Sequence, residues 1–441
     1  MIDIPFELYH ETLNKKAVAL KHGKVSQVIG LIIKVDGLDA FIGEVCEIEI
    51  KSRAKTVLSE VVGFVDETVL LMPLDDLDGI GPGCLVRPTG KALKIEVSPD
   101  MLGKTFDGLG RPLSQGALEN TATYDVNRAS PDPFKRPRIS TIMQTGVKAV
   151  DGMLTVGEGQ RMGIFAGSGV GKSTLLGMMA RYSDADVIVI GLIGERGREV
   201  LEFIENDLGP EGYKKSVVVA ATSDQPPLVR LKGAYVATAI AEYFRDQGKK
   251  VVLMMDSVTR VAMAQREIGL ATGEPPTTKG YTPSVFTVLP KLLERSGNAE
   301  SGSITAFYTV LVEGDDMNEP IADSVRGILD GHIILSRQIA SENHYPAIDI
   351  QNSLSRLMKE LVSDSHDETA GKIRENLATY RESKDLIDVG AYQQGSNPIV
   401  DQAIRLNQPI KSFLKQKTSE SYDFEDTVQA MRAVLNNQPI R

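Results

Sequence analysis

Cysteine and histidine are scarce in this sequence and do not cluster. The two cysteines, Cys46 and Cys84, form no CxxC or metal-ligand spacing, so they predict reduced structural thiols rather than a disulfide or a zinc site. The five histidines are scattered along the chain and give no ligand pattern. Neither residue type therefore supports a metal-binding role.

Long apolar runs are also missing. The longest, residues 187–194 (VIVIGLIG), is far shorter than the ~20 residues that a membrane-spanning helix needs. The first residues, MIDIPFELYHETLNKK, lack the basic and then apolar pattern of a signal peptide. We therefore expect a cytoplasmic protein whose contact with a membrane passes through partners or a surface helix.

The sequence has fewer basic than acidic residues: 49 lysines and arginines against 59 aspartates and glutamates, which gives a net charge of -10. Nonspecific nucleic-acid binding needs clustered basic residues, so we expect no nucleic-acid partner. The hydrophobic content of 42% is that of an ordinary globular protein. A chain of 441 residues predicts two or three domains.

The first 90 residues predict a helix followed by a β-barrel. Residues 1–20 carry apolar side chains at spacings of three and four, which predicts an amphipathic helix. That helix either packs on its own domain or docks another protein. Residues 21–90 contain short Val- and Ile-rich runs separated by Gly, Asp and Pro, which predict a small barrel. Its few aromatic residues favour a structural or oligomerisation role over nucleic-acid binding.

Residues 91–365 predict an α/β domain, and residues 366–441 a helical one. The stretch 91–140 is rich in turns and is interpreted as connectors. Short apolar runs then alternate with helix-length segments such as residues 226–247, which indicates a parallel sheet covered on both faces. The predicted strands are residues 161–166, 187–194, 215–223, 249–256, 304–312 and 332–336.

Residues 166–173, AGSGVGKS, predict a phosphate-binding loop, since an apolar run precedes them and a helical pattern follows. Ala166 stands where the usual pattern has its first glycine. Glycines let successive N–H groups point at phosphate oxygens, and the helix that follows adds its dipole. The predicted nucleotide ligands are Gly167, Ser168, Gly169, Val170, Gly171, Lys172, Ser173 and Thr174.

Metal binding and hydrolysis need further residues. Ser173 can ligate Mg²⁺, and Asp256, at the end of an apolar run, can hold it directly or through water. The alternative for Asp256 is a helix cap. Glu195 follows another buried run and can orient or deprotonate a water molecule. From spacing alone, Glu195 is equally well explained as a surface partner of Arg196 or Arg198.

Five longer segments resemble, in order, the type III export ATPases, which are relatives of the rotary ATP synthase α and β subunits. These segments are residues 145–174, 192–203, 256–286, 302–337 and 344–356. Residues 266–286, REIGLATGEPPTTKGYTPSVF, are more similar to the flagellar branch than to the virulence branch. The resemblance implies a multidomain α/β protein with an N-terminal β-barrel, a RecA-like ATPase core and a C-terminal helical domain. It also implies a homohexamer with nucleotide sites between subunits.

The resemblance also assigns roles to residues. It implies that Glu195 is the catalytic glutamate and that Arg196 faces the γ-phosphate. Arg356 matches the arginine finger that a neighbouring subunit supplies, and Tyr345 matches the aromatic residue that stacks on adenine. Tyr392 is a weaker candidate for the same adenine pocket.

The implied function is Mg²⁺-dependent ATP hydrolysis that energises or regulates flagellar protein export at the cytoplasmic face of the inner membrane. The implied partners are a coiled-coil central stalk, a stator-like negative regulator on the N-terminal helix, the export gate, chaperones and export substrates. The alternatives are a virulence-type secretion ATPase and a catalytic subunit of a rotary F- or V-type ATPase. A hexameric RNA helicase and a scaffold that binds nucleotide without hydrolysis are further competitors.

Overall fold

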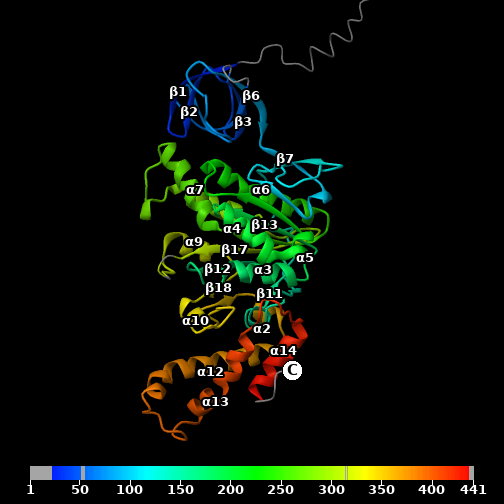
Figure 1. Cartoon of the computed structure of the whole chain (residues 1–441), viewed down its shortest axis with the longest axis vertical. Coiled ribbons are helices and arrows are strands. Elements are labelled where there is room, and N and C mark those ends of the chain that lie inside the picture. The colour runs from blue at the N-terminus through cyan, green and yellow to red at the C-terminus, as the bar shows by residue number, and fades with distance from the viewer. Residues whose placement is uncertain (1–21, 51–54, 313, 315, 437–441) are drawn as a thin grey trace, which may run out of the picture.

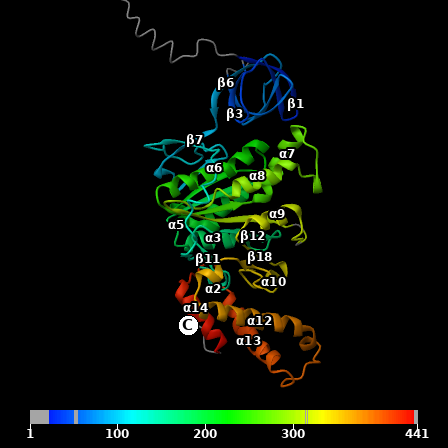
Figure 2. The same cartoon turned by 180° about the vertical axis from the view of Figure 1, so that it is seen from behind.

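Three layers of structure follow one another along the long axis of the molecule. The computed structural model describes residues 22–50, 55–312, 314 and 316–436. A barrel lies at one end, an α/β domain in the middle and a group of helices at the other end (Figure 1), and the reverse view shows the same order (Figure 2). The predicted multidomain fold is confirmed. The predicted helix over residues 1–20 lies outside the described residues.

The first domain is a closed six-stranded barrel with strand order β1-β2-β5-β4-β3-β6. Val- and Ile-rich strands form it because alternate side chains, such as Ile33 and Val35, point into a fully buried interior. Its strands are β1 (Gly23–Ile29), β2 (Ile32–Asp36), β3 (Glu44–Ile50), β4 (Lys55–Val65), β5 (Thr68–Pro73) and β6 (Leu85–Ala92).

The middle domain is built on one large sheet with the path β19-β18-β12-β17-β15-β13-β14-β8. All pairs along it are parallel except β18 with β19. Six of its strands are the apolar runs predicted from sequence: β12 (Arg161–Ala166), β13 (Val187–Ile193), β14 (Ser216–Ala221), β15 (Lys250–Asp256), β17 (Ser303–Leu311) and β18 (Gly331–Leu335). The antiparallel edge strand is β19 (Leu354–Ser355).

The stretch 91–140 is more than connectors, which corrects that interpretation. Strand β8 (Lys104–Asp107) pairs with β14 and extends the sheet, while β7 (Lys94–Val97) pairs with β9 (Ala122–Asp125). Each is four residues long, too short for an alternating or continuous apolar pattern to stand out among the surrounding glycines. Pairing with the longer β14 holds β8 at the edge of the sheet.

Helices cover both faces of the sheet. Alternate residues of a strand enter different cores: Val187 and Val189 pack on one side, and Ile188 and Ile190 on the other. The first side is covered mainly by α6 (Pro227–Asp246), α7 (Val258–Ala271), α8 (Pro283–Leu293) and α9 (Pro320–Ile328). The second holds α2 (Lys148–Met153), α3 (Lys172–Tyr182) and the π-helical turn η3 (Phe203–Leu208).

Smaller elements complete this domain, and they lie mostly in its loops. They are η2 (Pro99–Met101), β10 (Ile142–Met143), β11 (Val156–Gly157), α4 (Gly197–Glu202), α5 (Gly209–Lys214), η4 (Thr278–Gly280), β16 (Gly297–Asn298), α10 (Arg337–Ser341) and α11 (Met358–Leu361).

The C-terminal helices pack against α2 beneath the sheet. They are α12 (Asp364–Asp388), α13 (Pro398–Leu414) and α14 (Phe424–Leu435). Their buried apolar residues join the core of α2 and α3, and His366 Nε2 lies 2.7 Å from the Gly152 carbonyl oxygen. Within the part of the chain that the structure describes, no helix has the length and apolar character needed to cross a bilayer.

Candidate active site

The candidate site lies at the carboxyl ends of the parallel strands, where ligands of open α/β sheets bind. Strand β12 ends at Ala166, the glycine-rich loop follows, and α3 begins at Lys172. Gly169 and Gly171 have φ angles of 76° and 86°, a region that side chains with a Cβ rarely adopt. The loop lines a cavity of about 620 Å³. Seven of the predicted nucleotide ligands line it directly: Gly167, Ser168, Gly169, Gly171, Lys172, Ser173 and Thr174.

Val170, the remaining predicted ligand, is buried and does not appear in this lining. Its side chain belongs to the apolar core beneath the loop, together with that of Leu175. Only its backbone N–H can therefore serve a phosphate. The loop also approaches another chain segment closely, because a Cβ on Gly167 would lie 2.6 Å from Arg337 Nε.

Lys172 lies between two carboxylates inside the cavity. Its Nζ is 2.5 Å from Asp256 Oδ1 and 3.8 Å from Glu195 Oε1. Burial disfavours the charged amine, but the charges of Asp256 and Glu195 outweigh burial and raise the pKa of Lys172. The amine is therefore a fixed positive charge at the mouth of the loop.

Asp256 is held in place from a neighbouring strand. It ends β15, is buried, and accepts a 2.7 Å hydrogen bond from Thr309 Oγ1 on β17. The helix-cap alternative assigned its side chain to α7, but the residue that caps α7 is Ser257, whose side chain accepts from Arg260 N. The carboxylate of Asp256 faces the cavity instead.

Glu195 follows β13 and also faces the cavity. Gly194, with φ 71°, turns the chain there, and its N–H donates to the Ala221 carbonyl over 2.6 Å. Burial, followed by the negative charge of Asp256, raises the pKa of Glu195 to about 7, against the attraction of Lys172. A carboxyl group that titrates near neutrality is suited to proton transfer.

Arg196 and Arg356 occupy different surroundings. Arg196 lines the same cavity with an exposed side chain, and its Nη1 lies 3.7 Å from Glu199 Oε1. Arg356 follows β19, is exposed, and lies outside the lining of this cavity. Its Nη2 lies 3.4 Å from the Arg326 carbonyl oxygen. The structure thus brings Glu195, Lys172 and Asp256 together and leaves Arg356 apart from them.

A second cavity, of about 890 Å³, adjoins the loop at the other side of Gly171 and Thr174. Tyr345 and Pro346 line it, together with the segment 415–420 that follows α13. The Tyr345 side chain is 44% exposed, and a Cβ on Gly171 would lie 3.5 Å from its ring. The Tyr345 carbonyl accepts a 3.0 Å bond from Gln416 N. An aromatic face beside a phosphate loop is suited to stacking on a nucleobase.

Tyr392 does not belong to this second cavity. It lies in the connection between α12 and α13, where its hydroxyl is 2.9 Å from Asp401 Oδ1 and 3.0 Å from the Asn397 carbonyl oxygen and can donate its proton to either. It is absent from the lining of both cavities described above. These contacts indicate that Tyr392 stabilises the turn between the two helices.

Four charged residues of the first cavity were missed from sequence: Glu199, Arg260, Glu319 and Arg337. Arg260 carries a usable signal, because it lies in the first turn of α7, which begins directly after the strand that ends at Asp256. Its buried Nε has no hydrogen-bond partner in the described part of the chain. Arg337 follows β18, the parallel neighbour of β12, but only the strand order places it near the loop.

Comparison with known proteins gives three matching family models. They are the ATP synthase alpha/beta family beta-barrel domain at residues 25–90, the nucleotide-binding domain of the same family at 146–355, and the T3SS EscN ATPase C-terminal domain at 362–433. The flagellum-specific ATP synthase of Bacillus subtilis is 54% identical over 420 residues, 95% of this chain and 96% of the relative. The type 3 secretion system ATPase of Xanthomonas euvesicatoria is 52% identical over 422 residues, 96% of each chain.

Comparison with solved structures points to the same family as the sequence comparisons. The assembled ATPase EscN of the enteropathogenic E. coli type III secretion system superposes with a TM-score of 0.89 at 46% identity, covering 94% of this chain and all of that one. EscN in complex with its central stalk EscO gives a TM-score of 0.86 at the same identity and coverage. The chain therefore belongs to the ATP synthase alpha/beta family, among the flagellum-specific and type III secretion ATPases, and is an ATP-hydrolysing enzyme.

Proposed function

We propose that this ATPase binds Mg²⁺-ATP with its phosphates in the first cavity and its base in the second. The observation that carries the proposal is the convergence of Lys172, Asp256 and Glu195, from α3, β15 and the end of β13, on the cavity of the glycine-rich loop. The backbone N–H groups of residues 167–174 would receive the phosphates. Tyr345 would stack on the base.

The residues present fit a magnesium ion. Mg²⁺ prefers oxygen ligands and usually keeps several waters beside one or two carboxylates and the substrate phosphates. The Ser173 hydroxyl and the Asp256 carboxylate offer such oxygens. The described residues contain no group of three or more His, Cys, Asp or Glu that would hold a metal by themselves. Bound there, Mg²⁺ would neutralise charge on the β- and γ-phosphates.

Glu195 would orient and deprotonate the attacking water, and Arg196 and Lys172 would stabilise charge on the γ-phosphate. Glu195→Gln tests this role, because the amide keeps the shape of the side chain but cannot accept the proton. We expect hydrolysis to fall by at least ~10²-fold, with binding of a fluorescent ATP analogue unchanged. Retained turnover would remove Glu195 from the mechanism and favour a nucleotide-binding scaffold.

Arg356 would act in the site of a neighbouring subunit of a homohexamer. Its exposure and its position outside the chain's own cavity support this, as does the existence of EscN as an assembly. Arg356→Ala should slow turnover by ~10³-fold or more. The ATPase rate should rise cooperatively with protein concentration. Adding Arg356→Ala subunits to the wild-type protein should lower the ATPase rate of the wild-type subunits. Full activity of isolated monomers would contradict shared sites.

The enzyme would energise or regulate protein export through the flagellar type III apparatus, at the cytoplasmic face of the inner membrane. Relatives named for flagellar and for type 3 secretion systems are nearly equally similar, at 54% and 52% identity. Flagellar specificity rests on the segment 266–286. The test is reciprocal complementation: the gene should restore motility to a strain lacking its flagellar ATPase and fail to restore secretion to a virulence-system mutant. The opposite pattern would assign the virulence branch.

Two further contacts are proposed. A coiled-coil central stalk would occupy the ring, which the complex of EscN with its central stalk EscO supports. Residues 1–20 would bind a stator-like negative regulator, and chaperones, substrates and the export gate would complete the apparatus. Deleting residues 1–20 should abolish binding of the regulator and leave basal ATPase activity unchanged. Unaltered binding would remove the N-terminal segment from this role.

A further inference from the structure

The exposed Arg356 is connected through β18 to β12, the strand that leads into the phosphate loop of the same chain. Arg356 N donates to the Asp330 carbonyl over 3.0 Å, and Ser355 pairs with Gly331 where β19 meets β18. Strand β18 lies beside β12, with Met162 opposite Gly331. Arg356 therefore lies two strands away from the start of β12, at the end opposite the loop.

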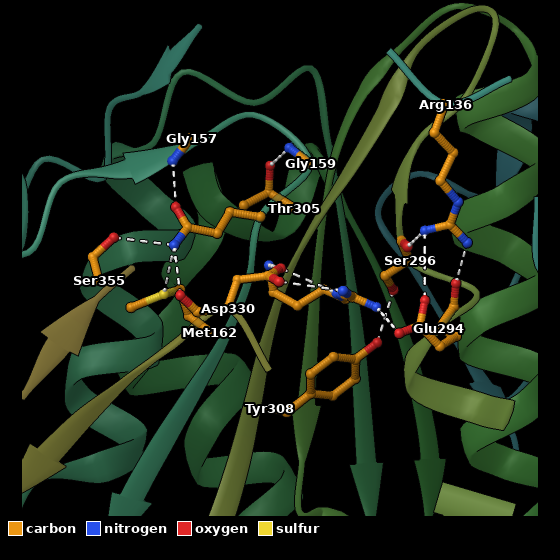
Figure 3. A network of polar contacts seen from close by, with 12 residues as sticks. Arg136, Gly157, Gly159, Met162, Glu294, Ser296, Thr305, Tyr308, Asp330 and Ser355 are labelled. Atoms are coloured by element: carbon orange, nitrogen blue, oxygen red, sulfur yellow. Dashed lines mark hydrogen bonds and ion pairs between the residues drawn. The ribbon is translucent and has the colours of Figure 1, made fainter. Parts of the chain in front are cut away.

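Gln160, immediately before β12, links these strands through its side chain. It is fully buried, and its Nε2 donates to Ser355 Oγ over 3.0 Å and to the Asp330 carbonyl over 3.3 Å. Its Oε1 accepts a 2.8 Å bond from Gly157 N. Figure 3 shows Ser355, Asp330 and Gly157 gathered around this amide. Gln160 therefore contacts both the Ser355 side chain, whose Oγ also donates to the Thr155 carbonyl over 2.8 Å, and the carbonyl that accepts from Arg356 N.

A second set of bonds fixes Asp330, the residue whose carbonyl accepts from Arg356. Its carboxylate accepts from Arg161 N at 3.0 Å, from Arg161 Nε at 3.1 Å and from Arg161 Nη2 at 3.2 Å. Arg161 also lies 2.6 Å from Glu294 Oε1. The base of β12 therefore holds Asp330 at several points, which leaves little freedom to the segment that carries Arg356.

Strand β12 has a function at each end. Its C-terminal end opens the phosphate loop, and its N-terminal end holds the chain before Arg356. It is paired with β17 from Arg161 to Ala166 and with β18 from Met162 to Ala166. A strand of six residues is roughly 20 Å long, so β12 directly connects the loop with the residues that hold the chain before Arg356.

We propose that Gln160 is a positioning residue for Arg356, so that β12 connects the nucleotide site of one subunit with the arginine that the same subunit offers to its neighbour. The inference rests on the proposed action of Arg356 in a neighbouring site. Gln160 itself touches neither nucleotide. A buried amide that serves only the local core would show the same bonds, so the test must separate a defect in the neighbour's site from a defect in the chain's own site.

Mixing two defective variants makes that separation. In Gln160→Leu the cavity of the loop keeps all its residues, but Arg356 is displaced. In Glu195→Gln the chain's own site is inactive, but Arg356 is in place. A Gln160→Leu subunit next to a Glu195→Gln subunit therefore has an intact cavity and receives a correctly placed arginine. Activity per Gln160→Leu subunit should rise on mixing, although the added subunit is inactive alone.

The expected values follow from random assembly. Alone, Gln160→Leu should lose between ~10- and 10²-fold in kcat, the effect of a small misplacement of a catalytic group, with affinity for a fluorescent ATP analogue unchanged. In an equal mixture about half of the Gln160→Leu subunits should regain a normal neighbour, so activity per such subunit should approach about half that of wild type. The assay is steady-state hydrolysis at saturating Mg²⁺-ATP.

Three further variants complete the design. Ser355→Ala removes the same 3.0 Å bond from the other side, together with the 2.8 Å bond from Ser355 Oγ to the Thr155 carbonyl, and it should be rescued in the same way if Gln160→Leu fails to fold. Thr305→Val is the matched control: it removes a buried 2.8 Å bond to Gly159 N, beside Gln160, without touching Ser355. It should leave kcat near the wild-type value. Arg356→Ala mixed with Glu195→Gln gives the reference for full rescue.

The outcomes distinguish the two proposals. Rescue of Arg356→Ala and of either Gln160→Leu or Ser355→Ala supports the positioning role. Rescue of Arg356→Ala alone overturns it and keeps the proposed function. If no mixture is rescued, Arg356 does not act in a neighbouring site, and the inference fails with that assignment. A loss of kcat in Thr305→Val equal to that in Gln160→Leu would make the effect one of general packing.

Discussion

At the scale of single residues, the proposed role of Glu195 as the base makes its pKa a prediction about the pH dependence of hydrolysis. Burial and the charge of Asp256 raise this pKa to about 7, so protonation removes the proposed base just below neutrality. A carboxyl group at its ordinary value would remain ionised throughout the same range. If Glu195 limits the rate of hydrolysis, that rate should change with pH near pH 7. A reaction that depends on a carboxylate with an ordinary pKa would show no pH dependence in that range.

The prediction is that kcat/KM rises by up to roughly tenfold from pH 6 to pH 8, with about half of the final value reached at pH 7, because this parameter reports the free enzyme. The measurement is hydrolysis at constant ionic strength with Mg²⁺ in excess. The nucleotide also titrates in this range, so binding of a fluorescent ATP analogue to Glu195→Gln over the same pH provides the correction. A flat corrected profile would contradict a pKa near neutrality.

Residues near the loop differ in how far the sequence predicts them. Lys172 follows from a local pattern, and Asp256 from the end of an apolar run. Glu195 was undecided from spacing alone, and only the resemblance favoured catalysis. Arg337 enters the cavity because β18 lies beside β12, a fact of strand order that local spacing does not contain. Contacts across the sheet were therefore the part that sequence reasoning missed.

At the scale of elements, long strands and helices were predicted well and short ones were not. The segments that became β13, β15 and α6 are long enough for periodicity to be decisive. Strand β8 has only four residues and is stabilised by pairing with β14, so its local sequence resembles a turn. The segment 415–420 likewise has no pattern, yet it lines the second cavity.

Gln416, within that segment, joins the C-terminal helices to the middle domain. Its Oε1 accepts from Lys148 N at 2.9 Å, and its Nε2 donates to the Gly146 carbonyl at 2.8 Å. Gln416→Leu leaves these buried groups unpaired and should cost about 2 kcal/mol or more. Since the segment lines the cavity proposed for the base, KM for ATP should rise several-fold with little change in kcat.

Gln402→Leu, at an exposed position of α13, is the control and should alter neither quantity. Thermal unfolding and steady-state kinetics measure both effects. A loss of stability without a change in KM would show that segment 415–420 does not contribute to nucleotide binding.

At the scale of the whole molecule, the order of the three domains was predicted, but the contacts that join them were not. One such contact connects barrel and sheet domain: Lys232 Nζ of α6 lies 2.7 Å from Glu60 Oε2 of β4, with the side chains 6% and 7% exposed. Nothing in the local sequence pairs two residues so far apart. Burial raises the pKa of Glu60, against the attraction of Lys232, so the carboxylate depends on its partner.

Lys232→Met should destabilise the joint by about 3–5 kcal/mol, because it leaves a buried carboxylate alone, whereas adding Glu60→Leu should recover most of the loss. Urea denaturation followed by circular dichroism measures both. Lys214→Met is the matched control: it breaks a pair of the same 2.7 Å length with Glu211, but on the surface, and should have no measurable effect. If the double variant is no more stable than Lys232→Met, the two residues do not act as a pair.

The position of Tyr345 has a practical consequence. The chain contains no tryptophan, and the ring of Tyr345 lies half exposed beside the phosphate loop. Replacing it with tryptophan would introduce a single indole fluorophore at the proposed base cavity, with no other tryptophan to contribute to the indole emission. Quenching during titration would then count filled sites in an assembled ring directly, whether or not turnover occurs.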